Sequence, residues 1–100
     1  FGTLPDGRTV HALNLRAGHL NATVLTWGAI LQDVRLAGVD RSLTLGSDRL
    51  DDYLGPMAWF GSMVGPVANR IGGARALIDG VEHHFPANQG GKHTLHSGAA

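Results

Sequence analysis

Cysteine is absent from this sequence, which excludes both a disulfide framework and a thiolate metal site. No apolar run approaches the roughly 18 residues of a membrane helix, and no basic leader with an apolar stretch is present. Eight basic side chains offset eight acidic ones, so no basic surface favours nucleic acid. We therefore expect neither a nucleic-acid partner nor a membrane segment. The expected location is the cytoplasm, with the periplasm as the alternative, and no pattern indicates an oligomeric state.

Glycine and apolar residues are abundant in the chain. Apolar residues make up 43% of the 100 positions and charged residues 16%, a balance typical of a folded chain. Fifteen glycines, many beside polar residues, indicate frequent turns between short strands. No shift in composition marks a second domain. The sequence therefore predicts an all-β, antiparallel structure within a single domain over residues 1–100.

Apolar side chains that recur at every second position predict the strands. The predicted ranges are 9–16, 20–27, 30–36, 42–45, 75–78, 81–85 and 93–96. Several of them are apolar on both faces, and a sheet of 100 residues cannot cover both faces alone. We therefore expect the chain to be part of a larger β structure.

Two turns, one helical turn and one apolar cluster connect these strands. Pro5-Asp6-Gly7 and Asp79-Gly80 predict tight turns, the second of them a two-residue type I′ hairpin. One short helical turn is expected within residues 47–54, with Ser47 or Asp48 as its cap. An apolar cluster that we expect in the core follows it, formed by Trp59, Phe60, Met63 and Val64.

Asn69 and Arg70 are the first candidates for binding chemistry. Arginine offers a planar fork of donors, and asparagine offers both donors and an acceptor. Side by side near the mouth of a sheet, they suit the recognition of hydroxyl groups and ring oxygens. Alternatively, Arg70 forms a surface ion pair and Asn69 sits in a turn. Taken alone, the two residues favour this alternative.

His96 is the second candidate, because it lies between Leu95 and the small pair Ser97-Gly98, where a ligand can approach closely. A histidine there can bond a sugar oxygen or move a proton. Alternatively, backbone partners satisfy it within a loop, and its local sequence alone favours that interpretation.

A metal site is not expected from the other histidines. His83 and His84 point to opposite faces of the predicted strand, as do His93 and His96. No carboxylate cluster accompanies them, and no carboxylate is placed as a general base. Glu82, the only glutamate, should face solvent after the hairpin.

The order of several short motifs resembles the N-terminal third of the aldose 1-epimerase (galactose mutarotase) family. Gly-Pro-Val-Ala-Asn-Arg-Ile at 65–71 comes first, Asp79-Gly80 follows, and Leu95-His96 closes the set. Asn88 belongs to this strongest set, and further matches are Phe1-Gly2 with Pro5-Asp6-Gly7, Trp27-Gly28-Ala29, Leu45-Gly46, Asp51 and Tyr53. The resemblance implies a large antiparallel β-sandwich (supersandwich), of which residues 1–100 are an incomplete N-terminal part.

The resemblance also implies a reaction, the interconversion of the α and β anomers of aldohexoses such as galactose and glucose, without metal or cofactor. A glutamate base takes the C1 hydroxyl proton and a histidine acid serves the ring oxygen. Asn69 and Arg70 match substrate-binding residues. His96 matches the first of two active-site histidines, a substrate-binding and catalytic residue. The acid and the base are expected beyond residue 100, so the 100-residue piece alone is expected to be inactive.

Three departures from the family pattern concern the same region. Pro66 replaces a basic residue, and Lys92-His93 stands where an asparagine is common, so that His93 is a candidate replacement donor. Ser97 replaces the first glycine after Leu-His and could change the preferred hydroxyl. Two other functions remain open, a non-catalytic carbohydrate-binding or modulating protein of the same fold and a small β interaction module.

Overall fold

The computed structural model describes residues 1–98. The chain divides into two compact units, Phe1–Met63 and Val64–Ala100. The expected single domain stays a prediction, and each unit is described by itself below. Within the described residues, no helix has the length and apolar character needed to span a membrane.

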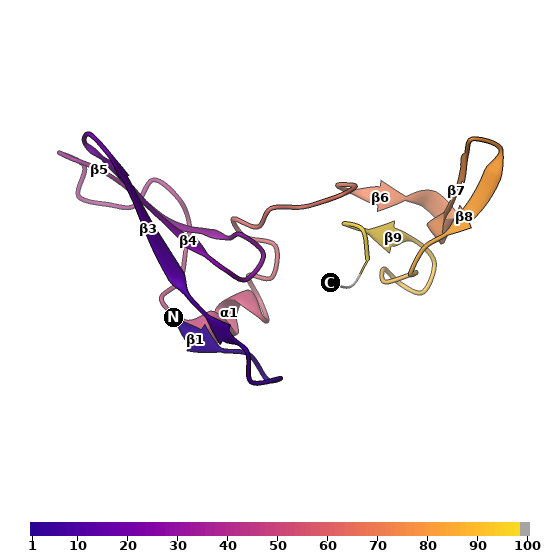
Figure 1. The fold of residues 1–100 in the computed structure, drawn as a ribbon, viewed down its shortest axis with the longest axis horizontal. Helices are drawn as coiled ribbons and strands as arrows, with labels where there is room; N and C mark the ends of the chain where they lie inside the picture. Colours follow the sequence, from indigo (N-terminus) through magenta and orange to yellow (C-terminus); the bar gives the residue numbers. More distant parts are fainter. Residues whose placement is uncertain (99–100) are drawn as a thin grey trace. The chain divides into compact units, whose positions relative to one another are not determined.

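The first unit is built from antiparallel strands (Figure 1). They are β1 (Gly2–Thr3), β2 (Thr9–Val10), β3 (Ala12–Ala17), β4 (Leu20–Leu25) and β5 (Leu31–Leu36). β1 pairs with β2, and β3, β4 and β5 form a three-stranded sheet in that order. The single strand expected over 9–16 is divided at His11. The backbone of His11 turns to Thr26, whose Oγ1 accepts its N–H at 2.9 Å and whose N–H reaches its carbonyl at 3.0 Å.

The turn predicted at Pro5-Asp6-Gly7 is confirmed. The N–H of Leu4 donates to the Arg8 carbonyl at 2.8 Å, and Gly7 takes a φ of 89°, which glycine adopts readily. The Asp6 carboxylate accepts the backbone N–H of Arg8 at 3.0 Å and its Nε at 2.8 Å. These bonds, the backbone one foremost, hold the pKa of Asp6 below its usual range.

The strand expected over 42–45 is wrong. Leu43 donates its N–H to the Val34 carbonyl at 2.8 Å, but the Val34 N–H goes to the Ser42 side chain at 3.2 Å. A hydroxyl therefore replaces the backbone partner that a ladder requires. Farther along, Gly46 lies so close to Gln32 that a Cβ there would be 1.8 Å from the Gln32 carbonyl oxygen.

The predicted helical turn exists as α1 (Leu50–Tyr53), but its expected side-chain cap is wrong. Arg49 is the N-cap residue, and no side chain caps the helix. Ser47 lies farther upstream, where its Oγ accepts the Arg49 N–H at 3.1 Å and donates to Asp52. The hydroxyl of Tyr53 accepts the Ser47 N–H at 2.8 Å, which ties the segment before the helix to a buried ring.

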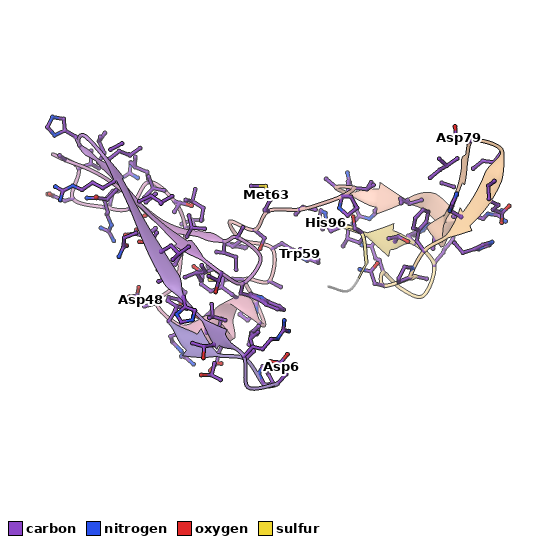
Figure 2. The ribbon with its side chains drawn as sticks, in the orientation of Figure 1. Asp6, Asp48, Trp59, Met63, Asp79 and His96 are labelled. Carbon is purple, nitrogen blue, oxygen red and sulfur yellow. The ribbon has the colours of Figure 1, made fainter. Side chains whose placement is uncertain are left out.

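The apolar core of the first unit does not include the cluster expected after the helix. Six buried residues form this core: Leu4, Val10, Leu25, Ile30, Leu50 and Tyr53. Trp59, Phe60 and Met63 are instead 51%, 42% and 77% exposed, and Val64 is half-buried. Trp59 and Met63 are labelled in Figure 2. The backbone of this segment is bound to the strand-forming region, because Leu31 donates to the Gly61 carbonyl at 2.9 Å. That pairing fixes the path of the chain without placing these side chains in the core.

The second unit contains two small antiparallel pairs (Figure 1). Its elements are β6 (Arg70–Ile71), the 3-10 helix η1 (Gly72–Ala74), β7 (Arg75–Ile78), β8 (Val81–His84) and β9 (Thr94–Leu95). The β7–β8 hairpin is confirmed, with Asp79 and Gly80 at φ 50° and 78°. Among residues 64–98, Ala74 is the only buried apolar residue. This unit therefore has little apolar core, and most of the contacts described below are hydrogen bonds.

Candidate functional site

The pairing of β6 with β9 brings the predicted site residues together. Arg70 stands opposite Leu95, and Ile71 opposite Thr94. Continuing this register places Asn69 opposite His96, which follows β9 directly (Figure 2). The His96 N–H donates to the Asn69 carbonyl at 2.8 Å. Residues 27 positions apart in the sequence thus become direct neighbours.

The other half of this rung is made by the His96 side chain. In a regular ladder the Asn69 N–H would donate to the His96 carbonyl. Here it donates to His96 Nδ1 at 3.1 Å. Both residues have left-handed backbones, at φ 62° for Asn69 and 51° for His96. Because Nδ1 acts as the acceptor, the neutral imidazole carries its proton on Nε2.

Arg70 lies beside this pair and is held by two amide side chains. Its Nε donates to Oε1 of Gln89, and its Nη1 donates to Oδ1 of Asn69 at 3.0 Å. Within residues 1–98, the ion pairs do not include Arg70. Among the described residues, the structure therefore shows amide contacts at Arg70 in place of the alternative, a surface ion pair. Two amide oxygens orient the guanidinium, and no acid of residues 1–98 pairs with its charge.

Gln89 is a residue of the site that sequence reasoning missed. It lies in a loop whose backbone closes on itself, with the Gln89 N–H on the His93 carbonyl at 3.0 Å and the reverse bond at 3.1 Å. Next to it, Asn88 bonds both backbone groups of Leu95, at 2.7 and 2.9 Å. Nothing in the local sequence around Gln89 indicates that it reaches Arg70.

The two departures nearest the site both bind backbone. His93 accepts the Gly73 N–H at Nδ1, at 3.1 Å, so that nitrogen accepts where the sequence suggested a replacement donor. Ser97 accepts the Val67 N–H at 2.8 Å and donates to the Val67 carbonyl at 2.9 Å. Both side chains hold segments together around the Asn69–His96 rung.

Two other titratable side chains of the second unit, His84 and Glu82, contact each other. His84 Nε2 contacts Oε1 of Glu82 at 2.9 Å along β8, and Glu82 is exposed as expected. Within the part of the chain that the structure describes, no three His, Asp or Glu side chains gather as metal ligands would.

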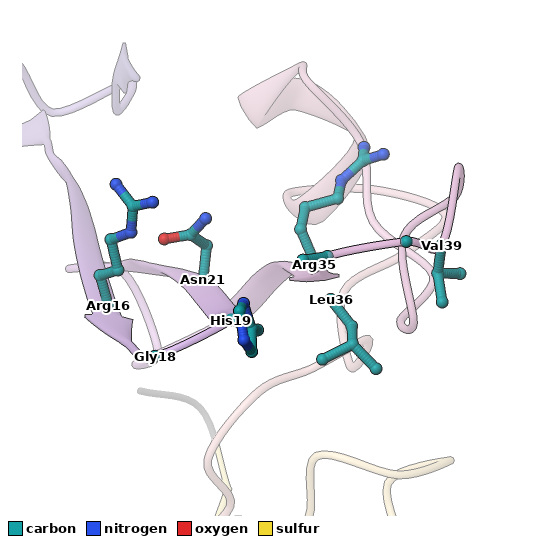
Figure 3. A pocket seen from close by; sticks show the side chains of 9 residues that line it. Arg16, Gly18, His19, Asn21, Arg35, Leu36 and Val39 are labelled. Atoms are coloured by element: carbon teal, nitrogen blue, oxygen red, sulfur yellow. The ribbon is translucent and has the colours of Figure 1, made fainter.

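A polar hollow of about 250 Å³ lies on the three-stranded sheet of the first unit (Figure 3). Arg16, Asn21 and Arg35 stand opposite one another across β3, β4 and β5, and their side chains point to one side. Asp33 holds Arg35 by an ion pair at 2.9 Å. That bond, followed by the hydroxyl of Ser42, lowers the pKa of Asp33, and the bond to Asp33 raises the pKa of Arg35. Because Arg35 is already neutralised, we place the candidate site at Asn69, Arg70 and His96.

Comparison with known proteins identifies the family. Residues 11–100 match the model of the aldose 1-epimerase family. The chain is 36% identical to rat galactose mutarotase over 98% of its own length, and 34% identical to aldose 1-epimerase of Escherichia coli K12 over 94%. The chain therefore belongs to the aldose 1-epimerase family. It spans 30% of the length of the rat relative and 28% of that of the bacterial one.

Two solved structures share the fold. A crystal structure of a GalM/aldose epimerase homologue from C. elegans matches with a TM-score of 0.76 and 31% identity, over 90% of this chain and 29% of the other. Galactose 1-epimerase from Lactobacillus acidophilus matches with a TM-score of 0.66 at 21% identity, over 90% of this chain and 30% of the other. These matches confirm the antiparallel galactose-mutarotase-type fold class that the resemblance implied.

Proposed function

We propose that the protein containing this chain is an aldose 1-epimerase, which interconverts the anomers of aldohexoses such as galactose and glucose by opening and closing the sugar ring. Family membership supports the reaction class. The observation that carries the proposal is the rung between Asn69 and His96, in which the Asn69 N–H holds Nδ1 at 3.1 Å. A fixed imidazole beside an oriented arginine suits a rigid, polyhydroxylated ring.

His96 serves this reaction as a hydrogen-bond donor through Nε2. A neutral imidazole with its proton on Nε2 can polarise the ring oxygen of the sugar. Complete transfer of that proton would leave the histidine as an imidazolate anion. His96 therefore stabilises charge that develops on the sugar oxygen, and the transferred proton comes from another group. The family resemblance assigns that proton to a second histidine and assigns the base to a glutamate.

Arg70 and Asn69 supply the fixed polar groups of the sugar subsite. The guanidinium of Arg70 is oriented by Gln89 and by the Asn69 side chain before any sugar binds. Donors that are already in place lose little freedom when a hydroxyl takes its position, which favours the transition state over free sugar. Arg70 and Asn69 thus act by holding hydrogen-bond donors in place and by presenting a positive charge to the sugar.

Polarimetry on freshly dissolved α-galactose and α-glucose tests the proposal with the whole protein that carries this chain. We expect it to accelerate mutarotation, and His96→Asn to lower kcat/KM by about 10²- to 10³-fold, as loss of one aligned donor does. Thermal unfolding of the variant checks that it folds.

Two results would contradict the proposed activity, and a third would contradict the role of His96. Galactose binding by calorimetry without any acceleration of mutarotation would identify a non-catalytic sugar-binding protein. Neither binding nor acceleration would leave a protein-interaction role. A variant at His96 with the wild-type rate would remove this side chain from the mechanism.

A further inference from the structure

Ser97 does what a strand partner normally does, but with its side chain. Its Oγ accepts the Val67 N–H at 2.8 Å and donates to the Val67 carbonyl at 2.9 Å. One hydroxyl thereby satisfies both backbone groups of a residue 30 positions earlier in the chain. The segment before Asn69 is fastened to the segment after His96 at this point.

The backbone of Ser97 makes the presence of a side chain notable. Its φ is 66°, a left-handed conformation that glycine adopts without penalty and that other residues rarely take. His96 precedes it at φ 51°, so two consecutive non-glycine residues share this conformation. On backbone grounds alone glycine suits position 97 better. The hydroxyl contacts are the compensating gain in this structure.

Three ties in a row join the two segments. Ser97 holds Val67, His96 holds Asn69, and Leu95 stands opposite Arg70 in the ladder. The contact between Asn69 and His96 sets the imidazole tautomer. A strand pair, Arg70 with Leu95, lies on one side of it only. On the other side, the Ser97 hydroxyl holds the segment ends together.

We propose that Ser97 is a positioning residue, whose hydroxyl keeps the Asn69 N–H on His96 Nδ1 and so keeps the His96 proton on Nε2. The consequence for catalysis rests on the proposed epimerase function, and the consequence for the tautomer does not. Without the hydroxyl, the turn after β9 loses its hold on Val67. The imidazole then samples orientations in which Nδ1 carries the proton.

The experiment compares Ser97→Ala and Ser97→Gly in the whole protein, with Ser62→Ala as the matched control. Ser62 is also a serine outside the strands, and its Oγ donates to the Ala58 carbonyl at 3.4 Å within its own segment. Histidine-selective ¹⁵N NMR reports the tautomer of His96, and polarimetry gives kcat and KM for galactose. Thermal unfolding of all three variants separates lost positioning from lost stability.

In wild type and in Ser62→Ala, we expect the His96 nitrogens to show one tautomer, protonated at Nε2. In both Ser97 variants, Nε2 and Nδ1 signals should move toward each other as the tautomers mix. The rate should fall about ten- to a hundredfold, mainly in kcat, since misplacement of an aligned group affects the transition state most. Ser97→Gly should lose this rate even though glycine relieves the backbone.

The outcomes separate the two claims. Unchanged His96 nitrogen signals in both Ser97 variants would overturn the positioning role, whether or not the protein is an epimerase. Mixed tautomers in a protein without mutarotase activity would support the positioning role and contradict the proposed function. A wild-type kcat in Ser97→Gly together with mixed tautomers would show that the tautomer does not matter for the rate, which overturns the catalytic part.

Discussion

At the scale of single residues, side chains of the second unit repeatedly take the place of backbone. The amide of Asn88 pairs with both backbone groups of Leu95, and the imidazole of His96 replaces a carbonyl in the rung with Asn69. Such bonds stabilise a fold by about 1 kcal/mol each, and losing one partner costs more when the other stays buried. In a unit with little apolar core, these bonds decide the shape of the site.

Arg70→Ala should reduce activity without unfolding the protein. Arg70 is exposed, and its partners Gln89 and Asn69 can turn to water once it is gone. Loss of a charged donor to a sugar hydroxyl costs about 1.5–3 kcal/mol, or roughly 10- to 150-fold in kcat/KM. Polarimetry beside thermal unfolding measures both effects. Arg16→Ala, which removes an exposed arginine on β3, is the control, and equal losses of folding and activity in Arg70→Ala would assign Arg70 to structure.

At the scale of elements, β5 shows how one strand residue links pH to stability. Asp33 is paired with Arg35, and its carboxylate side chain is 25% exposed. The guanidinium, followed by the Ser42 hydroxyl, lowers the pKa of Asp33 from 3.8. A lowered pKa in the folded state means that the carboxylate stabilises the fold above its unfolded pKa. This contribution disappears as pH falls through the folded pKa.

Asp33→Asn should therefore lower the free energy of unfolding at neutral pH by about 0.2–1 kcal/mol, the range of partly exposed ion pairs. The difference between wild type and variant should shrink as pH falls below about 4, because the unfolded wild type then takes up a proton at Asp33 more readily than the folded state does. Urea unfolding at pH 7 and pH 3 measures it. Asp40→Asn, at an acid outside the ion pairs of the described residues, is the control. A constant difference across this pH range would contradict the assigned cause.

Elements with a local cause could be predicted from the sequence, and those with a distant cause could not. Asp79-Gly80 specifies its hairpin because both residues accept positive φ, and Pro5-Asp6-Gly7 specifies its turn because proline presets φ and Gly7 accepts a positive φ. The missing strand at 42–45 depends instead on Ser42 meeting Val34, a contact across a loop. Likewise, the apolar side chain of Trp59 looks like core in the sequence, and only the packing of other residues leaves it exposed.

The candidate site divides along the same line. Asn69, Arg70 and His96 could be predicted because the family pattern contains them, and their proximity follows from the β6–β9 pairing. The contacts of Gln89 and Ser97 could not be predicted. They depend on loop paths that no local pattern encodes. The tautomer of His96 could not be predicted from the sequence either, because it depends on the contact with the Asn69 N–H.

At the scale of the whole molecule, apolar burial is unevenly divided. The first unit has a core of six buried apolar residues, whereas Ala74 is the only buried apolar residue among residues 64–98. Amide exchange should reflect the difference. We expect the Leu25 amide, fully buried and bonded to the Ile30 carbonyl, to exchange at least about tenfold more slowly than the Leu95 amide.

Hydrogen exchange of the whole protein followed by NMR gives both rates in one experiment. The amide of Val24, in the same strand of the first unit, is an internal reference for β4. Equal protection of the Leu25 and Leu95 amides would mean that parts of the protein outside residues 1–98 stabilise the second unit. The prediction about uneven burial would then fail for the whole protein.

The amide of Asn88 has one more consequence, for solubility. β9 is a two-residue strand, and only one of its edges faces β6. On the other edge, the Leu95 N–H and carbonyl would be a template to which a strand of a second molecule could add. The Asn88 side chain occupies that template with bonds of 2.7 and 2.9 Å. Asn88 orders the loop beside the site, and its side chain thus also blocks edge-to-edge pairing of β9 with a second molecule.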